Sequence, residues 1–484
     1  MSYATSTSSL GALLNYPLRF IHLVHTLLLK IFPPSSTLKR TDNIYIETLG
    51  LAGLFLFLFN INLVWDLHRN GETMLIIAFF LAIRHWWGVL IRQPLFWLMI
   101  AFAVSLMIST HVGNVNFPQH THVNEAKSMA RFCLYVGLAW WIGTNFTSIR
   151  NAFLIVCLGF ALSSLAWLLD RETISSMFEG MRPGVELLGM GTARFGTWIG
   201  FLLVGTIILG KNFLPGSLWT SRHYFIGYAG FLILSAIFAI GVFVIASRTM
   251  WIAIALAIPL GIIGQILLSG EQKRLALKKL SSTTVLIILI AIFTASQFDR
   301  IEERFSLESK NFSHLAAGEF HQVERTFEDR GGESALGVRI QMYMWSLENK
   351  AFATPFGWGP RSLRAINNHQ ELRDKYNWHF GHSHFHSDFF MLSFQLGLFG
   401  ISVLSLILIF LLKGVVAGYR KKDIPEHWFI FCLMTTLYVL IVGLTNSNFM
   451  THAFLPVWAG LMFACGLITC TNTKSELKRH NDYE

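Results

Sequence analysis

Residues 381–400 read GHSHFHSDFFMLSFQLGLFG, and the change of character within this stretch decides how the chain folds. The first half is polar and carries histidines at alternate positions, His382, His384 and His386. The second half opens an apolar run that continues to about residue 412, which is long enough for a membrane helix. Imidazole can both accept and donate a proton near neutral pH. Histidines at the start of a membrane helix therefore suggest proton transfer on a lipid-anchored substrate.

The apolar character extends over most of the chain. Hydrophobic residues make up 53% of the sequence and charged residues only 14%, against about 25% charged in soluble proteins. A helix needs about 20 apolar residues to cross a bilayer. About 12 runs of this kind occur, and their length and continuity exclude the alternating strands of a membrane barrel. They are 44–66, 73–91, 94–112, 129–145, 152–169, 195–210, 223–246, 250–269, 283–298, 388–412, 426–446 and 452–470. The sequence predicts an all-α polytopic membrane protein with about 12 transmembrane helices.

Basic clusters orient these helices, because Lys and Arg in short loops mark the cytoplasmic side. An even number of spans with both termini inside places every cluster on one face. The clusters are Lys39-Arg40, Lys273 to Lys279, Arg420 to Lys422 and Lys474 to Arg479. The net charge of +10 therefore reflects topology, with membrane lipids that carry anionic headgroups as the expected partner. Nothing in the sequence supports nucleic-acid binding.

This topology divides the chain into five parts. They are a cytoplasmic or interfacial N-terminal segment (1–43, amphipathic over 17–34), transmembrane helices 1–9 (44–298), a large periplasmic loop (299–387), transmembrane helices 10–12 (388–470) and a cytoplasmic tail (471–484). The large loop is too long for a simple connector and should contain helices, for example over 338–350. Residues 67–72 and 113–128 are predicted as shorter outer loops. All five cysteines fall inside predicted spans, so the sequence indicates neither a disulfide framework nor a thiolate metal site.

Among the arginines on the predicted outer side, three are candidates for binding phosphate. Arg194 stands in GTARFGT, Arg248 in IASRTMW and Arg339 in LGVRIQMYMW. A guanidinium group binds phosphate oxygens through two parallel hydrogen bonds, and it can stabilise a departing diphosphate without a metal. A structural interpretation is also open: the first two arginines could anchor helix ends at the interface, and the third could form a salt bridge on its helix.

The histidines allow a metal site or a general base. Alternation places the three rings on one face of an extended segment, and Asp388 could complete a zinc site. No second cluster of ligands accompanies them, however, and His382 is suited to hydrogen-bonding loop carbonyls. A neutral histidine could instead remove the proton from an attacking sugar hydroxyl. With the outer arginines, this chemistry fits a polyprenyl diphosphate sugar, whose anionic group lies at the interface and whose glycan lies outside. The residues alone leave open which histidine acts.

The pattern resembles the O-antigen ligase and polymerase superfamily of bacterial envelope enzymes. His386-Ser387 followed by Gly397 and Gly400 is similar to the ligase signature, and His384 matches its paired-histidine form. Ser-Arg248-Thr resembles the arginine that follows a long helix in the family. Gly337-Val-Arg339, with the later Pro355-Phe-Gly-Trp-Gly turn, resembles the large-loop arginine segment, and Arg194-Phe-Gly a further family arginine. The resemblance covers about 194–400.

The resemblance implies an inverting, metal-independent glycosyltransferase without a cofactor in the bacterial inner membrane, with its active site facing the periplasm. The implied donor is O-antigen linked to undecaprenyl diphosphate, and the implied acceptor is a sugar of lipid A–core. His386, Arg248 and Arg339 take the catalytic roles, with the histidine as base and both arginines also binding the diphosphate. Arg194 and His384 assist in substrate binding.

Other functions are compatible with parts of this pattern. An O-antigen polymerase of the same superfamily also binds a diphosphate donor, and a related enzyme could transfer the glycan to protein hydroxyls. A transporter of lipid-linked glycans could use outer arginines to attract an anionic lipid. A transporter should line a path across the bilayer with charge, and the spans offer few charged residues beyond Arg84. The absence of an evident internal repeat also speaks against a transporter built from paired halves.

Overall fold

A computed structural model describes the chain over residues 19–30, 44–60, 65–118, 121–145, 192–209, 224–245, 248–268, 335–349, 354–380, 384–422 and 424–445, with short pieces between 153 and 162 and between 313 and 319. No strand occurs in these ranges. The principal helices are α2 (Ile44–Phe59), α3 (Trp65–Leu90), α4 (Pro94–Asn116), α5 (Val123–Asn145), α8 (Thr192–Leu209), α10 (Tyr224–Ile245), α11 (Arg248–Leu268), α15 (Ala335–Glu348), α16 (Ser362–Asn368), α17 (Gln370–Tyr376), α18 (Asp388–Arg420) and α19 (Glu426–Thr445). The described part is all-helical, as the sequence predicts.

Most of the predicted spans coincide with a helix. Among the described residues, four helices are long and apolar enough to cross a bilayer: α4, α11, α18 and α19. Shorter apolar helices lie at Ile44–Phe59, Gly196–Leu209 and Gly230–Val242. The predicted spans 283–298 and 452–470 lie outside the described residues, and only pieces of 152–169 are described. The count of 12 therefore stays a prediction.

The predicted outer loop at 67–72 is helical and forms the early turns of α3. Its polar residues suggested a loop, yet two of them are buried and hydrogen-bonded. His68 Nδ1 donates to the carbonyl of Phe57 at 3.0 Å. Glu72 accepts from the hydroxyl of Tyr135 at 3.0 Å. The helix continues through polar sequence because α2 and α5 satisfy these buried groups.

The N-terminal helix over residues 19–30 packs against α2. His25 is buried and its Nε2 lies 3.1 Å from a carboxylate oxygen of Glu47. Phe20, Leu23 and Leu27 are exposed on the same helix. Part of the predicted amphipathic segment is thus tied to the helical bundle by a buried polar contact.

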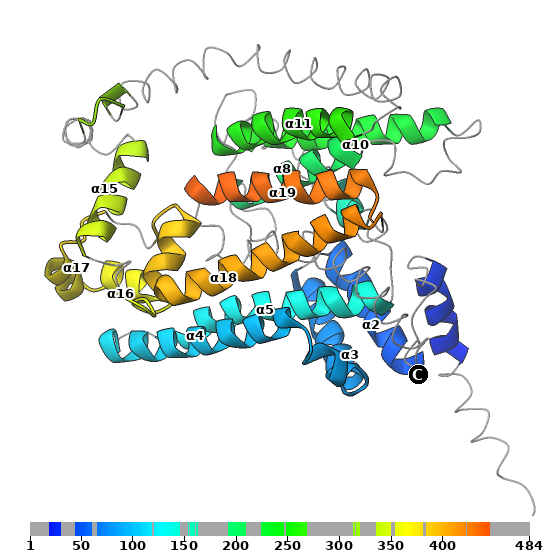
Figure 1. Cartoon of the computed structure of the whole chain (residues 1–484), viewed down its shortest axis with the longest axis horizontal. Coiled ribbons are helices and arrows are strands. Elements are labelled where there is room, and N and C mark those ends of the chain that lie inside the picture. The colour runs from blue at the N-terminus through cyan, green and yellow to red at the C-terminus, as the bar shows by residue number, and fades with distance from the viewer. Residues whose placement is uncertain are drawn as a thin grey trace, which may run out of the picture.

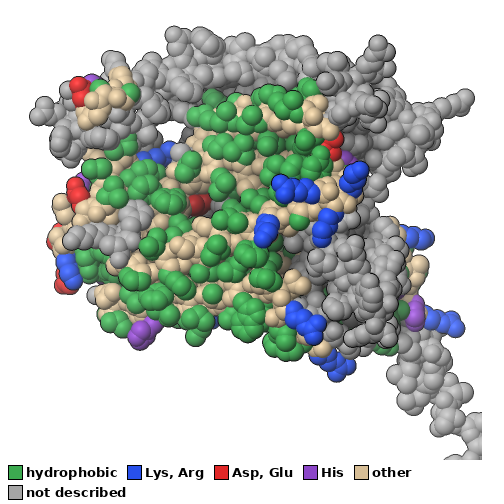
Figure 2. All heavy atoms as spheres, in the orientation of Figure 1, with side chains coloured by type: hydrophobic (Ala, Val, Ile, Leu, Met, Phe, Trp, Pro, Cys, Tyr) green, Lys and Arg blue, Asp and Glu red, His purple; other side chains and the backbone are tan. Residues whose placement is uncertain are grey.

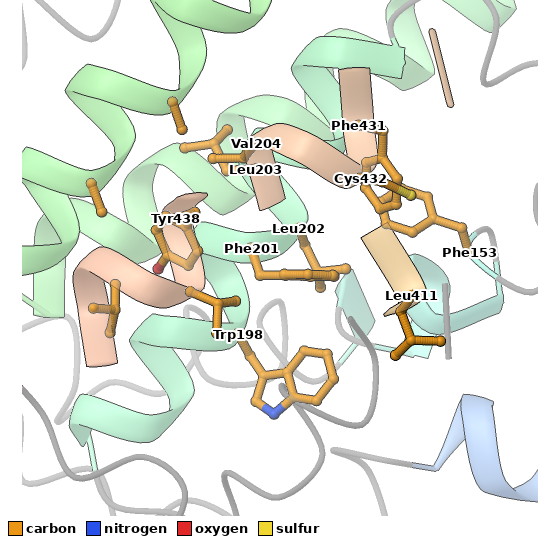
Figure 3. Close-up of a cluster of buried hydrophobic side chains, with 14 of the residues drawn as sticks. Phe153, Trp198, Phe201, Leu202, Leu203, Val204, Leu411, Phe431, Cys432 and Tyr438 are labelled. Carbon is orange, nitrogen blue, oxygen red and sulfur yellow. The ribbon is translucent and has the colours of Figure 1, made fainter. Parts of the chain in front are cut away.

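The largest hydrophobic core lies where α8, α11, α18 and α19 meet. Figure 3 shows its aromatic centre, to which α8 contributes Trp198 and Phe201, and α19 contributes Phe431 and Tyr438. The ring centroids of Phe201 and Phe431 are 6.1 Å apart and nearly perpendicular, a favourable arrangement for aromatic rings. The hydroxyl of Tyr438 donates to the carbonyl of Thr197 at 3.0 Å. This core holds α8 and α19 antiparallel.

A separate core forms within the long polar segment that precedes α18. Its buried residues come from α15, α16, α17, the end of α4 and the start of α18; they include Phe117, Val338, Met342, Trp345, Leu363, Ile366, Trp378, Phe385, Met391 and Phe394. Figure 1 shows α15, α16 and α17 gathered at the end of the bundle where α18 begins. That end is called the histidine end below. The predicted helix at 338–350 is confirmed as α15, at slightly earlier bounds.

Helix α18 is interrupted at Gly397, whose φ of 68° and ψ of −174° are not helical. An interruption there costs the helix two of its own hydrogen bonds, those from the amides of 398 and 399 to the carbonyls of 394 and 395. Residues 354–359 supply both the missing donors and the missing acceptors. The replacements are Trp358 N to Phe394 O (2.8 Å), Gly359 N to Gln395 O (3.1 Å), Leu398 N to Thr354 O (3.4 Å) and Phe399 N to Pro355 O (2.9 Å). Residues 398–420 that follow are by themselves long enough to cross about 30 Å of hydrocarbon.

This exchange requires glycine on both sides. Gly357 and Gly397 both have positive φ, and a Cβ on either would collide with the backbone of the other's segment. Gly359 also has positive φ and packs directly on Gly113 of α4. The sequence motif Pro355-Phe-Gly-Trp-Gly is thus the backbone partner of the helix break.

One of the predicted basic clusters lies within the described residues. Arg420, Lys421 and Lys422 are exposed at the end of α18 opposite the histidine end. In Figure 2, hydrophobic side chains cover the face over α4, α18 and α19, and Lys and Arg side chains gather toward that opposite end. The other basic clusters named from the sequence lie outside the described residues.

We expect Gly397→Ala to destabilise the folded protein. Alanine in the left-handed region costs about 1–2 kcal/mol, and its Cβ would also displace residues 354–357. Thermal unfolding in detergent measures the loss. The matched control is Gly230→Ala in α10, where a Cβ meets nothing within 4 Å and alanine should stabilise the helix by up to about 1 kcal/mol. Equal melting temperatures for the two variants would contradict this account.

Candidate functional site

His386 ends the segment that leads into α18. Its backbone has a φ of 54°, a left-handed conformation that is uncommon for residues other than glycine. Its ring is half-buried and lies 4.2 Å from the ring of His384, measured between centroids. Strained backbone of this kind costs about 1–3 kcal/mol and is concentrated at functional sites. The structure thus singles out His386 and places His384 beside it, while His382 lies outside the described residues.

The helices that carry Arg194 and Arg248 begin at the histidine end, where α18 begins. Arg194 lies in the first turn of α8, and Arg248 is the first residue of α11. Near the far end of these helices, Gln265 of α11 donates to the carbonyl of Ile208 of α8, so the two helices run parallel. Both arginine backbones therefore lie at the histidine end; their side chains are outside the described part.

Helix α18 is aligned with them through α19. Gly443, near the end of α19, packs against the carboxylate of Asp388 at the start of α18. Because α8 and α19 are antiparallel, α8, α11 and α18 all begin at one end. The start of a helix carries partial positive charge and unpaired amide groups, which favour an anionic ligand.

Arg339 reaches the site from α15. It is half-buried and lies one helical turn before Tyr343. The ring of Tyr343 stacks on Phe390 in the first turn of α18, with centroids 3.9 Å apart and planes 5° from parallel. Burial raises the pKa of Tyr343, and the charge of Arg339 and the hydroxyl of Ser387 oppose that shift. The structure thus brings Arg339 close to the segment that carries His386.

Arg361, which follows the loop of residues 354–359, fastens this part of the chain to α5 and to His122 just before it. Arg361 Nε donates to a carboxylate oxygen of Glu125 at 3.1 Å. The amide of Arg361 donates to Nδ1 of His122 at 3.1 Å, and His122 Nε2 donates to the carbonyl of Phe117 at 3.3 Å. These partners fix His122 as the neutral tautomer with its proton on Nε2. Burial raises the pKa of Glu125 to about 7, opposed by the charge of Arg361.

Sequence reasoning missed the residues that hold this site together. Tyr343, His122, Glu125 and Arg361 were not singled out, because each lies in a stretch that reads as an ordinary loop or amphipathic helix. The available signal was indirect: an acidic residue and histidines in the predicted outer loop 113–128, facing a chain segment more than two hundred residues away. Nothing in the sequence pairs the two.

Among the residues that the structure describes, no group of three or more His, Cys, Asp and Glu side chains is arranged to hold an ion. Asp388, the proposed extra zinc ligand, is 4% exposed and faces α19 at Gly443.

Comparison with known proteins finds a family match for the central part of the chain. Residues 233–405 match the family model described as O-Antigen ligase. The match begins in α10 and ends in α18, so it includes Arg248, Arg339, His386 and the helix break. No curated protein matches the chain.

We expect Arg361→Ala to destabilise the protein by about 1–3 kcal/mol, below the cost of breaking a fully buried pair because both side chains keep some solvent contact. Adding Glu125→Gln should recover part of this loss, because it removes the carboxylate that Arg361→Ala leaves buried. Arg364→Ala is the control. Arg364 is exposed on α16, which begins directly after Arg361, and its charge acts on Glu125 less strongly than that of Arg361, so the melting temperature should change less. A double variant as unstable as the sum of its single variants would refute the pairing.

Glu125 should also make stability depend on pH. Its pKa rises from 4.5 in the unfolded chain to about 7 in the fold, so the folded state binds the proton more tightly and stability falls as pH rises through this window. Glu125→Gln does not titrate and should not show this fall. Melting temperatures measured between pH 5 and pH 8 test this expectation. The melting temperature of Glu125→Gln should rise relative to that of the wild type as the pH increases to about 7. A constant difference between the two melting temperatures at every pH would contradict the assignment.

Proposed function

We infer that the chain is a member of the O-antigen ligase family, and we propose that it transfers O-antigen glycan from undecaprenyl diphosphate to a sugar hydroxyl of lipid A–core. The reaction takes place on the periplasmic face of the bacterial inner membrane. The family match over residues 233–405 supports the membrane glycosyltransferase class. The donor, the acceptor and the side of the membrane belong to the proposal.

The observation that carries the proposal is the gathering of these groups at the histidine end. α8 carries Arg194 in its first turn there, α11 begins there with Arg248, and α18 begins there at Asp388, two residues after His386. Arg339 approaches the same helix start from α15. A diphosphate at the membrane interface would meet guanidinium groups and helix starts, which both favour negative charge. His386, the proposed base, lies in the same region.

In the proposed reaction, His386 accepts the proton of the acceptor hydroxyl as the oxygen attacks the anomeric carbon of the donor. The new glycosidic bond forms as the bond from that carbon to the diphosphate oxygen breaks. Undecaprenyl diphosphate leaves with the electron pair. Attack opposite the leaving group inverts the anomeric carbon.

The arginines act on the leaving group. Negative charge grows on the diphosphate as the bond breaks, and Arg248 and Arg339 stabilise it by charge-assisted hydrogen bonds. Arg194 assists in binding the donor, and His384 supports the base from its adjacent ring. All these steps are acid–base and electrostatic, so the proposed mechanism uses no cofactor.

We expect His386→Ala to abolish transfer while the protein still folds in the membrane. Loss of a general base typically lowers the rate by about 10²–10⁴-fold. The measurement is transfer by purified protein in detergent, from a lipid-linked glycan to lipid A–core. His379→Ala is the matched control. His379 is exposed, lies in the same loop, and its Nδ1 is hydrogen-bonded to the carbonyl of Asn377. Wild-type transfer by His386→Ala would overturn the assignment of the base.

Gene deletion separates the related functions. Loss of all long lipopolysaccharide chains with accumulation of lipid-linked polymer supports the ligase. Core carrying a single unit indicates a polymerase instead, and loss of glycosylated protein indicates transfer to protein hydroxyls. A pure transporter is excluded by transfer in detergent, where no membrane separates two compartments.

A further inference from the structure

The junction between α15 and the start of α18 is built around Tyr343. The parallel stack of its ring on Phe390 fixes one end of the side chain. On either side of Tyr343, Met342 and Trp345 are buried in the core that α15, α16 and α17 form before α18, so helix α15 is held in place. The tyrosine hydroxyl is therefore carried to a defined position beside the base segment.

Two groups of the proposed site lie near the Tyr343 side chain. Arg339 is one turn earlier on α15, the spacing at which side chains of a helix meet. Ser387 follows His386 directly and is 1% exposed. Its hydroxyl does not cap α18 and has no hydrogen-bond partner of good geometry among the described residues. Ser387 directly precedes the first turn of α18, and Phe390 of that turn stacks on Tyr343, so the stack brings the Tyr343 side chain to the Ser387 segment. In agreement with this placement, Ser387 and Arg339 both oppose the rise that burial causes in the pKa of Tyr343.

Resting on the function proposed above, we propose that Tyr343 is a positioning residue whose hydroxyl links the Arg339 guanidinium to the Ser387 hydroxyl. The link fixes the separation between the arginine that binds the diphosphate and the His386 base. An arginine side chain has many rotamers, and ordering it in one of them costs conformational entropy. The link lowers the part of that cost that falls on each transfer. Substrate binding completes the hydrogen bonding of the buried Ser387 hydroxyl by drawing the three groups together.

The hydroxyl and the ring of Tyr343 have separable roles. Tyr343→Phe keeps the stack on Phe390 and removes only the link, so its melting temperature should match that of the wild type. Its kcat should fall by about 10- to 100-fold, the range expected when reacting groups lose alignment. The KM for the lipid-linked donor should change little, because Arg339 remains. Tyr343→Leu also removes the stack and should lower the melting temperature as well.

Tyr419→Phe provides the matched control. Tyr419 lies on α18 and, like Tyr343, stacks on a phenylalanine. Its partner is Phe429 of α19, with centroids 4.3 Å apart and planes 10° from parallel, at the end of α18 opposite the histidine end. The same chemical change there should leave kcat, KM and melting temperature unaltered. Equal kcat values for Tyr343→Phe and wild type would overturn the inference.

A double-mutant cycle tests the link itself. If Tyr343 and Ser387 act as one unit, Tyr343→Phe combined with Ser387→Ala should lose no more kcat than the worse single variant. Losses that multiply would contradict the link. His386→Ala in the same assay keeps the two proposals apart: an active His386→Ala refutes the proposed function, whereas an inactive His386→Ala with fully active Tyr343→Phe refutes only the positioning role.

Discussion

Four backbone hydrogen bonds join residues 354–359 to the break in α18, and the arrangement of the site depends on them. A helix inside a membrane protein can be interrupted only where other groups satisfy the amides and carbonyls that the break releases. Here one loop supplies every replacement, with the hydroxyl of Ser109 on α4 as an additional donor to the carbonyl of Gln395. The break and the loop are therefore one structural unit, and neither is stable without the other.

This unit connects the long polar segment to the bundle. Its glycines bring the loop against α4, and Arg361 then reaches α5 through Glu125 and His122. As a result, the hydrophobic core formed by α15, α16 and α17 packs against the first turns of α18. The segment that carries His386 and the helix α15 that carries Arg339 are therefore both held at the start of α18. Such an arrangement suits the proposed reaction, which requires a base and a diphosphate-binding group at a set separation.

Much of the architecture was predictable, because a bilayer imposes a simple rule on sequence. Long apolar runs gave most helices within a few residues, and helical periodicity gave α15. The turns around 67–72 were predicted wrongly, since burial of His68 and Glu72 depends on partners in α2 and α5 that no local pattern reveals. The span from 388, predicted as continuous, likewise contains a break. The sequence does not reveal this break, because Gly397 alone cannot indicate whether a distant loop replaces the lost hydrogen bonds.

The sequence by itself determined the helical membrane class, the position of the basic clusters and the candidate residues His386, Arg194, Arg248 and Arg339. These follow from composition, hydropathy and motif spacing, which are local properties of the chain. Only the tertiary structure decided that α8, α11 and α18 start at one end, that His386 has a left-handed backbone, and that Tyr343 of α15 stacks on Phe390 at the start of α18. These features arise from contacts between segments far apart in the chain, and such contacts depend on how complete helices pack rather than on any single stretch of residues.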